Sequence, residues 1–160
     1  MNEVGGALAN PAQFTAVGRP TIRNPLMTFL KPIIFMFGGV IVSIIGSVLG
    51  GLLDLGFLIA IFSLLGSLVQ LVGLVYYYIT IVKMHNELAS VAPNLFPWWH
   101  YIIPYYNIYL MLLVVPKEVA QAKQAVGARE PARPWFMYIL FPYALASDLN
   151  DIARAQGAQG

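Results

Sequence analysis

Residues 33–82 constrain this chain most, because Asp54 is the only charged side chain among them. A helix needs about 20 apolar residues to cross the ~30 Å hydrocarbon core of a bilayer. The two runs 33–53 and 55–82 both reach that length. Lipid offers the backbone no hydrogen-bond partner, so such runs are expected to be α-helices. The sequence therefore predicts an all-α membrane protein built around a transmembrane helical hairpin.

The composition of the whole chain agrees with this class. The chain is 59% hydrophobic and 10% charged, whereas a soluble domain carries about 25% charged residues. A formal net charge of +2 gives no reason to expect nucleic acid as a partner. The chain has no cysteine, which excludes disulfides, thiolate metal sites and cysteine nucleophiles from it.

Small and polar residues recur every three to four positions in both predicted spans, which places them on one face of each helix. Helices can approach closely where side chains are this small. Two interpretations remain open: the two faces pack against each other within the hairpin, or one of them receives a second copy or a partner helix. The candidate packing residues are Gly39, Ser43, Gly46, Ser47, Gly50 and Gly51 in the first span, and Ser63, Gly66, Ser67, Gln70 and Gly73 in the second.

Asp54 lies in the glycine-rich turn that joins the two predicted spans. Glycine supports the backbone conformations that a tight turn requires. We expect the Asp54 carboxylate to reach water at the far membrane interface. The alternative is an ion or proton site, because an ionisable residue within a membrane is a functional candidate by default.

The segments before the hairpin are expected to form an extended N-terminal arm over residues 1–24, without the basic start and apolar core of a signal peptide. Asn24 followed by Pro25 is a helix-start pattern. It predicts a short surface helix over 25–31, with a kink or restart at Pro32. The resulting division is an arm (1–24), a surface helix with the hairpin (25–82), and an aromatic-rich region of interfacial and surface helices (83–160).

Aromatic residues indicate where the chain meets the headgroup region, because amphipathic rings settle at that depth and lysine extends beyond it. The second helix is expected to leave the bilayer there and to continue in water until Pro93. The expected interfacial anchors are Tyr76, Tyr77, Tyr78, Lys83, Trp98, Trp99 and Trp135.

Two later apolar segments, 101–115 and 135–147, are short for a crossing and each carries a proline. If they do not cross, all nine Lys and Arg residues lie on one side of the membrane. If both cross, four of these charges lie on the far side, against the positive-inside tendency. The charges favour two spans plus two re-entrant or interfacial segments, with a cytoplasmic N-terminus. Two short spanning helices remain the alternative.

Two further helices are predicted near the C-terminal end. Residues 116–126 are expected to form a surface helix that stops at Gly127. Ser147, followed by Asp148 and Asp151, is a second helix-start pattern, with carboxylates in the first turn. The alternative for this end is a cation site on Asp148, Asn150 and Asp151.

The runs YYYITIVKMHNEL (76–88) and FPYALASDLN (141–150) resemble small bacterial multi-pass inner-membrane proteins of unknown function. The resemblance implies a helical architecture in a bacterial inner membrane. It implies no activity and no functional residues.

The sequence shows no catalytic pattern. It has no phosphate-binding glycine loop with lysine, no Gly-x-Ser-x-Gly elbow and only two histidines. We therefore predict no catalytic residue, no metal site, no cofactor and no enzyme activity. The one candidate cofactor residue is His100, as an axial ligand to haem or another pigment.

Three function classes remain open. The first is a structural, self-associating or accessory subunit of a larger membrane assembly, with lipid and other membrane subunits or a second copy as partners. The second is a small oligomeric transporter or channel with a path lined by Ser43, Ser47, Ser63, Ser67 and Gln70. The third is sensing of the membrane surface by the aromatic and basic interfacial segments.

Overall fold

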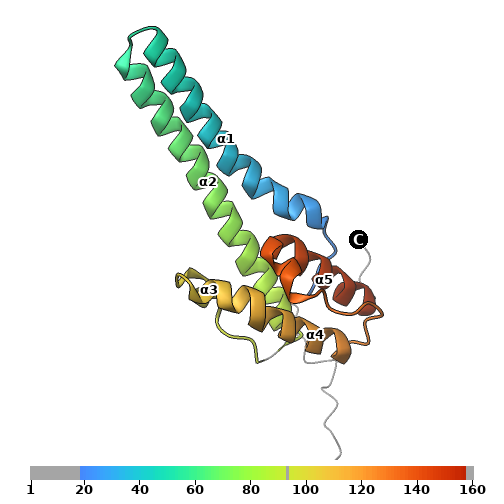
Figure 1. Ribbon diagram of the computed structural model, residues 1–160. Helices are drawn as coiled ribbons and strands as arrows, with labels where there is room; N and C mark the ends of the chain where they lie inside the picture. The colour runs from blue at the N-terminus through green and yellow to red at the C-terminus, as the bar shows by residue number, and fades with distance from the viewer. Residues whose placement is uncertain (1–18, 93, 158–160) are drawn as a thin grey trace, which may run out of the picture.

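The computed structural model describes residues 19–92 and 94–157, and every regular element in these ranges is helical. Two long helices, α1 (Pro25–Leu52) and α2 (Gly56–Ala89), form an antiparallel hairpin that projects from a cluster of shorter helices (Figure 1). Both helices are long enough and apolar enough to cross a membrane. The prediction of an all-helical chain with two such helices is confirmed for the described residues.

The N-terminal end of α1 follows its sequence signals, but the predicted separate surface helix over 25–31 and the restart at Pro32 are wrong. The Asn24 side chain accepts a hydrogen bond of 3.1 Å from the backbone N–H of Met27, and Pro25 occupies the first turn. Pro32 lies buried inside an unbroken helix. Residues 25–31 are therefore the first turns of α1 and not a separate surface helix. A proline inside a helix removes one backbone hydrogen bond, and here the helix continues despite that loss.

α2 passes from an exposed part in the hairpin to a buried part in the remaining fold. Its apolar side chains are exposed as far as Ile79, which is 60% exposed, whereas Ile81 is fully buried. The helix then continues through Met84 and Leu88, both fully buried, before it ends at Ala89. The same helix therefore leaves the hairpin and enters the core of the remaining fold. Its continuation beyond the span agrees with the prediction, but the prediction that this part lies in water until Pro93 is wrong, because one face of it is packed in a core and the helix ends at Ala89.

We call the remaining fold the base. It consists of the end of α2 with six short elements: η2 (Trp98–Ile102) and η4 (Trp135–Leu140), which are 3₁₀-helices, α3 (Tyr106–Tyr109), the π-helical turn η3 (Leu110–Val114), α4 (Val115–Ala125) and α5 (Phe141–Ala155). The predicted surface helix 116–126 corresponds to α4, and Gly127 follows it with a φ of 67°. The predicted segment 101–115 is divided among η2, α3, η3 and the start of α4, and the predicted segment 135–147 is divided between η4 and α5.

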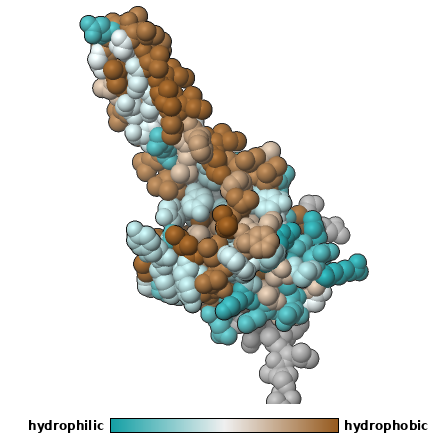
Figure 2. All heavy atoms as spheres, in the orientation of Figure 1, coloured by the Kyte–Doolittle hydropathy of each residue, from teal (hydrophilic) through white to brown (hydrophobic). Residues whose placement is uncertain are grey.

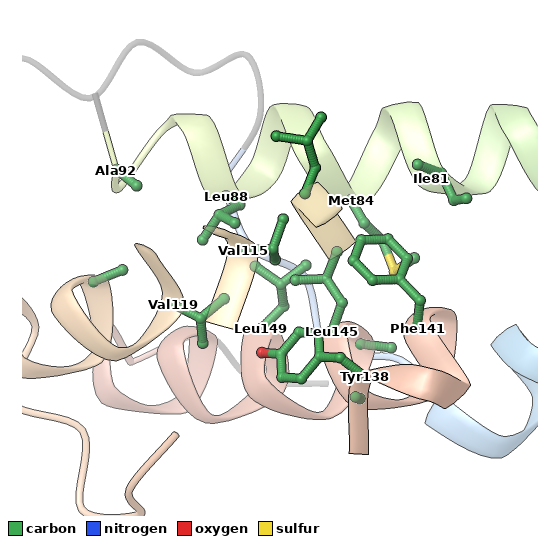
Figure 3. Close-up of a cluster of buried hydrophobic side chains, with 14 of the residues drawn as sticks. Ile81, Met84, Leu88, Ala92, Val115, Val119, Tyr138, Phe141, Leu145 and Leu149 are labelled. Atoms are coloured by element: carbon green, nitrogen blue, oxygen red, sulfur yellow. The ribbon is translucent and has the colours of Figure 1, made fainter. Parts of the chain in front are cut away.

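The base has a hydrophobic core formed mainly by α2, α4, η4 and α5 (Figure 3), to which Ala92, Tyr101 of η2 and Leu110 of η3 also contribute. The core side chains from these four elements point toward one another, and each buried aliphatic or aromatic side chain contributes about 1.5–3 kcal/mol relative to an exposed one. The labelled members are Ile81, Met84, Leu88, Ala92, Val115, Val119, Tyr138, Phe141, Leu145 and Leu149. This core fixes the lower end of the hairpin.

The predicted helix start at Ser147 is wrong. α5 begins at Phe141, with Pro142 in its first turn, and Ser147 and Asp148 lie buried in its middle. A proline in the first turn costs no hydrogen bond because its missing N–H has no partner there. The carboxylate of Asp148 therefore does not cap a helix and needs another partner.

Candidate functional site

Five of the candidate packing glycines lie in the seam between α1 and α2. A Cβ atom placed on Gly39 would lie 2.4 Å from the carbonyl oxygen of Gly66, and one on Gly46 would lie 1.9 Å from Cβ of Phe62. No real Cβ fits at such distances, so the helices depend on glycine for this approach. Equivalent close approaches occur at Gly50, Gly66 and Gly73. The structure thus places these glycines in packing within the hairpin.

The other candidate packing residues lie in or outside this seam. The Ser43 hydroxyl lies against Gly66 and donates to the Gly39 carbonyl oxygen at 3.1 Å, while the Gln70 side chain lies against Gly39. Ser47 and Ser67 are exposed, and their hydroxyls donate to the carbonyl oxygens four residues earlier. Ser63 is half-buried and Gly51 is exposed.

Asp54 lies exposed in the turn at the tip of the hairpin, with a φ of 52°. Exposed leucines flank it on both sides: Leu52 and Leu53 precede it and Leu55 follows it. The backbone N–H of Asp54 donates to the carbonyl oxygen of Gly51 at 3.4 Å, and the Asp54 carboxylate forms no hydrogen bond or ion pair within the described ranges.

The outer faces of the hairpin are apolar over most of its length. Figure 2 shows hydrophobic residues along both helices, whereas hydrophilic residues gather on the base. Ile34, Ile41 and Leu64 are among the large side chains that are more than half exposed. A continuous apolar surface of this extent marks a face that contacts lipid or protein.

The most polar buried site in the base is an ionic cluster centred on Asp148, whose side chain is fully buried. One carboxylate oxygen accepts hydrogen bonds of 2.7 Å from Lys123 and 2.7 Å from Arg133. The other accepts a 2.6 Å hydrogen bond from the Tyr138 hydroxyl and a 3.4 Å bond from the Arg133 backbone N–H. Both oxygens of Asp148 are therefore fully occupied by this chain's own donors.

The hydrogen-bonding capacity of the Lys123 ammonium group is also fully used. Besides Asp148, its ammonium group donates to Asp151 at 2.8 Å and to the carbonyl oxygen of Pro131 at 3.0 Å. Two cations thus face two carboxylates, which keeps this buried site close to neutral. A buried ion pair is tolerated only when such bonds replace the lost water.

The surroundings of the cluster raise the pKa values of two of its members, Tyr138 and Arg133. Burial raises the pKa of the Tyr138 hydroxyl, and the adjacent Asp148 charge raises it further. Burial lowers the pKa of Arg133, but the carboxylates of Asp148 and Asp151 outweigh this effect, so its pKa rises overall. A neutral tyrosine and a permanently charged guanidinium are donors to carboxylates and not acid–base groups near neutral pH.

The alternative of a cation site on Asp148, Asn150 and Asp151 does not fit this geometry. Lys123 and Arg133 already occupy the two carboxylates, and Asn150 bonds a different part of the chain. Sequence reasoning missed the two basic partners. The available signal was two acids three residues apart on one helix, preceded by a short basic linker that needs a counter-charge.

Residues 21–23 form a strap that crosses α2 and α5. The backbone of Arg23 exchanges two hydrogen bonds with the Asn150 side chain: its N–H donates at 2.8 Å, and its carbonyl oxygen accepts at 2.6 Å. The Arg23 guanidinium pairs with Glu87, which also accepts a 3.3 Å bond from the Thr21 N–H. The strap is the described end of the predicted arm, of which residues 1–18 lie outside the described residues.

Replacing Asn150 by alanine is expected to loosen the strap, because both backbone bonds to Arg23 are lost at once while the contacts with Glu87 remain. Unsatisfied buried groups cost about 1–3 kcal/mol each. Trypsin should therefore cleave after Arg23 faster in N150A than in the unmodified chain in mild detergent. Gln121→Ala removes an exposed amide from α4 and is the matched control. Equal cleavage rates in N150A and the unmodified chain would contradict the role assigned to Asn150.

The two histidines lie in an aromatic cluster near η2. His85 is buried, and its Nδ1 lies 3.3 Å from the Tyr101 hydroxyl. The ring of His100 lies 3.9 Å from the ring of Trp99, and its buried Nδ1 has no hydrogen-bond partner among the described residues. The described residues contain no group of three or more metal-binding side chains.

The predicted interfacial anchors lie either in the base or in the part of α2 that is next to the base. Lys83 and the three tryptophans, Trp98, Trp99 and Trp135, are exposed. Tyr76 is also exposed, whereas Tyr77 and Tyr78 are half-buried and make an edge-to-face contact with each other. Tyr77 packs against the core of the base.

Together these features define an all-helical chain with two membrane-length helices and an ion-paired base. No protein-family model, no curated protein and no solved structure matches the chain. A function for this chain must therefore be proposed from its own residues and their geometry.

Proposed function

We propose that this chain is a multi-pass protein of a bacterial inner membrane, with its N-terminus and its base on the cytoplasmic side. At a rise of 1.5 Å per residue, the apolar parts of α1 and α2 outside the base each reach about 30 Å, the thickness of the hydrocarbon core. All nine Lys and Arg residues lie outside 33–82. Positive charges favour the cytoplasmic side. The bacterial assignment rests on the resemblance of the two sequence runs.

The two later segments lie, in this proposal, at the headgroup level and do not cross the bilayer. Leu110 of the first segment and Leu145 of the second are buried in the core of the base, so both segments pack with the base instead of spanning lipid. The 3₁₀-helices η2 and η4 overlap the starts of these two segments. Both carry exposed tryptophan, the residue that favours the interface.

Within that membrane the chain acts as a non-catalytic structural or accessory subunit that associates through its hairpin. The observation that supports this role is that polar and apolar side chains are separated between the base and the hairpin. The buried ionic groups of the base bond one another, while the outer apolar faces of the hairpin are available to neighbours. Ser47 and Gly51 lie one helical turn apart on the exposed side of α1, where a neighbouring helix can approach closely.

Cysteine crosslinking in native membranes tests this role, because the chain has no cysteine of its own. Ser47→Cys is expected to give an oxidative crosslink to a second copy or to another subunit. Leu64→Cys, at an exposed large side chain of α2, is the matched control and is expected to stay uncrosslinked. A monomer at both positions, with no copurifying subunit, would contradict the proposal.

Two other measurements separate the alternatives. Solute flux in proteoliposomes without any crosslink would support a channel or transporter instead. A visible absorbance band of the purified chain that disappears in His100→Ala would support a pigment or haem subunit.

A further inference from the structure

We propose that α2 carries a binding groove for an anionic phospholipid at the point where it leaves the bilayer. The groove has a volume of about 390 Å³ and is lined, within the described residues, by Tyr78, Ile79, Val82, Lys83 and Asn86. This inference rests on the proposed membrane location of the hairpin. The inference adds that the groove binds one class of lipid, anionic phospholipid. An interfacial position of the aromatic residues alone does not imply such a preference.

The groove has an apolar part and a polar end. Ile79 and Val82 provide an aliphatic wall, and Ile79 continues the exposed apolar face of the hairpin. Lys83 and Asn86 follow within about one helical turn and are both exposed. The order from apolar to cationic along one helix matches the order from acyl chain to phosphate in a phospholipid.

The charge of the groove selects the headgroup. Lys83 forms no ion pair within the described residues, whereas Lys123 and Arg133 are bonded to carboxylates. A lysine near the membrane surface attracts anionic lipid. The Asn86 amide can donate a second hydrogen bond to a phosphate oxygen. A zwitterionic lipid carries its own positive charge and gains less from Lys83.

The depth of the groove agrees with a bound lipid. Ile79 is the last strongly exposed apolar residue before α2 becomes buried at Ile81. Tyr78 lies at the same level, where aromatic rings meet the headgroups. A phospholipid in the membrane therefore reaches the groove without leaving its leaflet.

Photo-crosslinking of the full chain in phosphatidylcholine vesicles tests the inference. The vesicles contain a small fraction of either phosphatidylglycerol or phosphatidylcholine with a photoreactive acyl chain, and adducts are mapped by mass spectrometry. Phosphatidylglycerol adducts are expected to concentrate at residues 78–82 relative to phosphatidylcholine adducts. In K83Q this enrichment should fall about fivefold, the change that corresponds to the ~1 kcal/mol attraction of one lysine to an anionic surface.

Lys117→Gln is the matched control, because Lys117 is exposed on α4 and lies outside the groove. Equal labelling of 78–82 by both lipids, or an equal loss in K83Q and K117Q, would overturn the lipid site. Adducts spread along the outer face of the hairpin would then still support its membrane location. A hairpin without any adducts from either lipid would overturn both proposals.

Discussion

Replacing Asp148 by asparagine is expected to lower the free energy of unfolding of the base by about 3–5 kcal/mol, the usual cost of breaking a buried ion pair. The substitution keeps the size of the side chain but removes its charge. Lys123 then remains buried with one carboxylate, Asp151, for the two cations of the cluster. Denaturant unfolding in mild detergent, followed by tryptophan fluorescence, measures this loss.

Arg154→Gln is the control for this measurement. Arg154 also pairs with Asp151, at 3.4 Å, but its side chain is 64% exposed. An exposed pair contributes about 0–1 kcal/mol, so R154Q should unfold close to the unmodified chain. If D148N were as stable as R154Q, the buried cluster would not be what holds α4, η4 and α5 together.

Replacing Gly39 by valine is expected to force α1 and α2 apart. The new Cβ would lie 2.4 Å from the Gly66 carbonyl oxygen and 2.9 Å from the backbone nitrogen of Gln70. Backbone atoms of a helix cannot rotate away as a side chain can. Overpacking of this kind costs about 1–3 kcal/mol and occasionally more. The thermal unfolding temperature in detergent should fall accordingly.

Gly38→Val is the matched control, because Gly38 is the neighbouring residue in the same helix. A Cβ at Gly38 meets nothing within 4 Å in the described structure. Both variants change helix propensity by the same amount, so their difference isolates the contact at the seam. Similar unfolding temperatures for G38V and G39V would show that the helices do not pack through Gly39.

The hairpin was predictable because its signals are local. A long run with one charged residue and the Asn24–Pro25 start each depend on neighbouring residues only, as does the Gly127 stop of α4 in the base. Small residues at a regular spacing also indicated which faces approach closely. Which neighbour they meet is a matter of tertiary packing, and the spacing alone left the two alternatives open.

The ionic cluster was not predictable in the same way. Asp148 looks like a first-turn carboxylate when only Ser147 and the following residues are considered. Its partners Arg133 and Lys123 lie 15 and 25 residues earlier in the chain. The two acids and the basic linker before them indicate that counter-charges are needed. Which side chains pair over this distance depends on how the helices pack, and the local pattern does not contain that information.

The unbroken course of α2 has a mechanical consequence. Its 34 residues include no proline, and at 1.5 Å per residue they extend about 51 Å. Because Met84 and Leu88 are packed in the core of the base, α2 connects the hairpin to the base as one rigid helix. Helices adjust to bilayers of different thickness by tilting. If the hairpin spans a bilayer as proposed, each change in tilt would therefore swing the base through the same angle and alter the face that it turns toward the water.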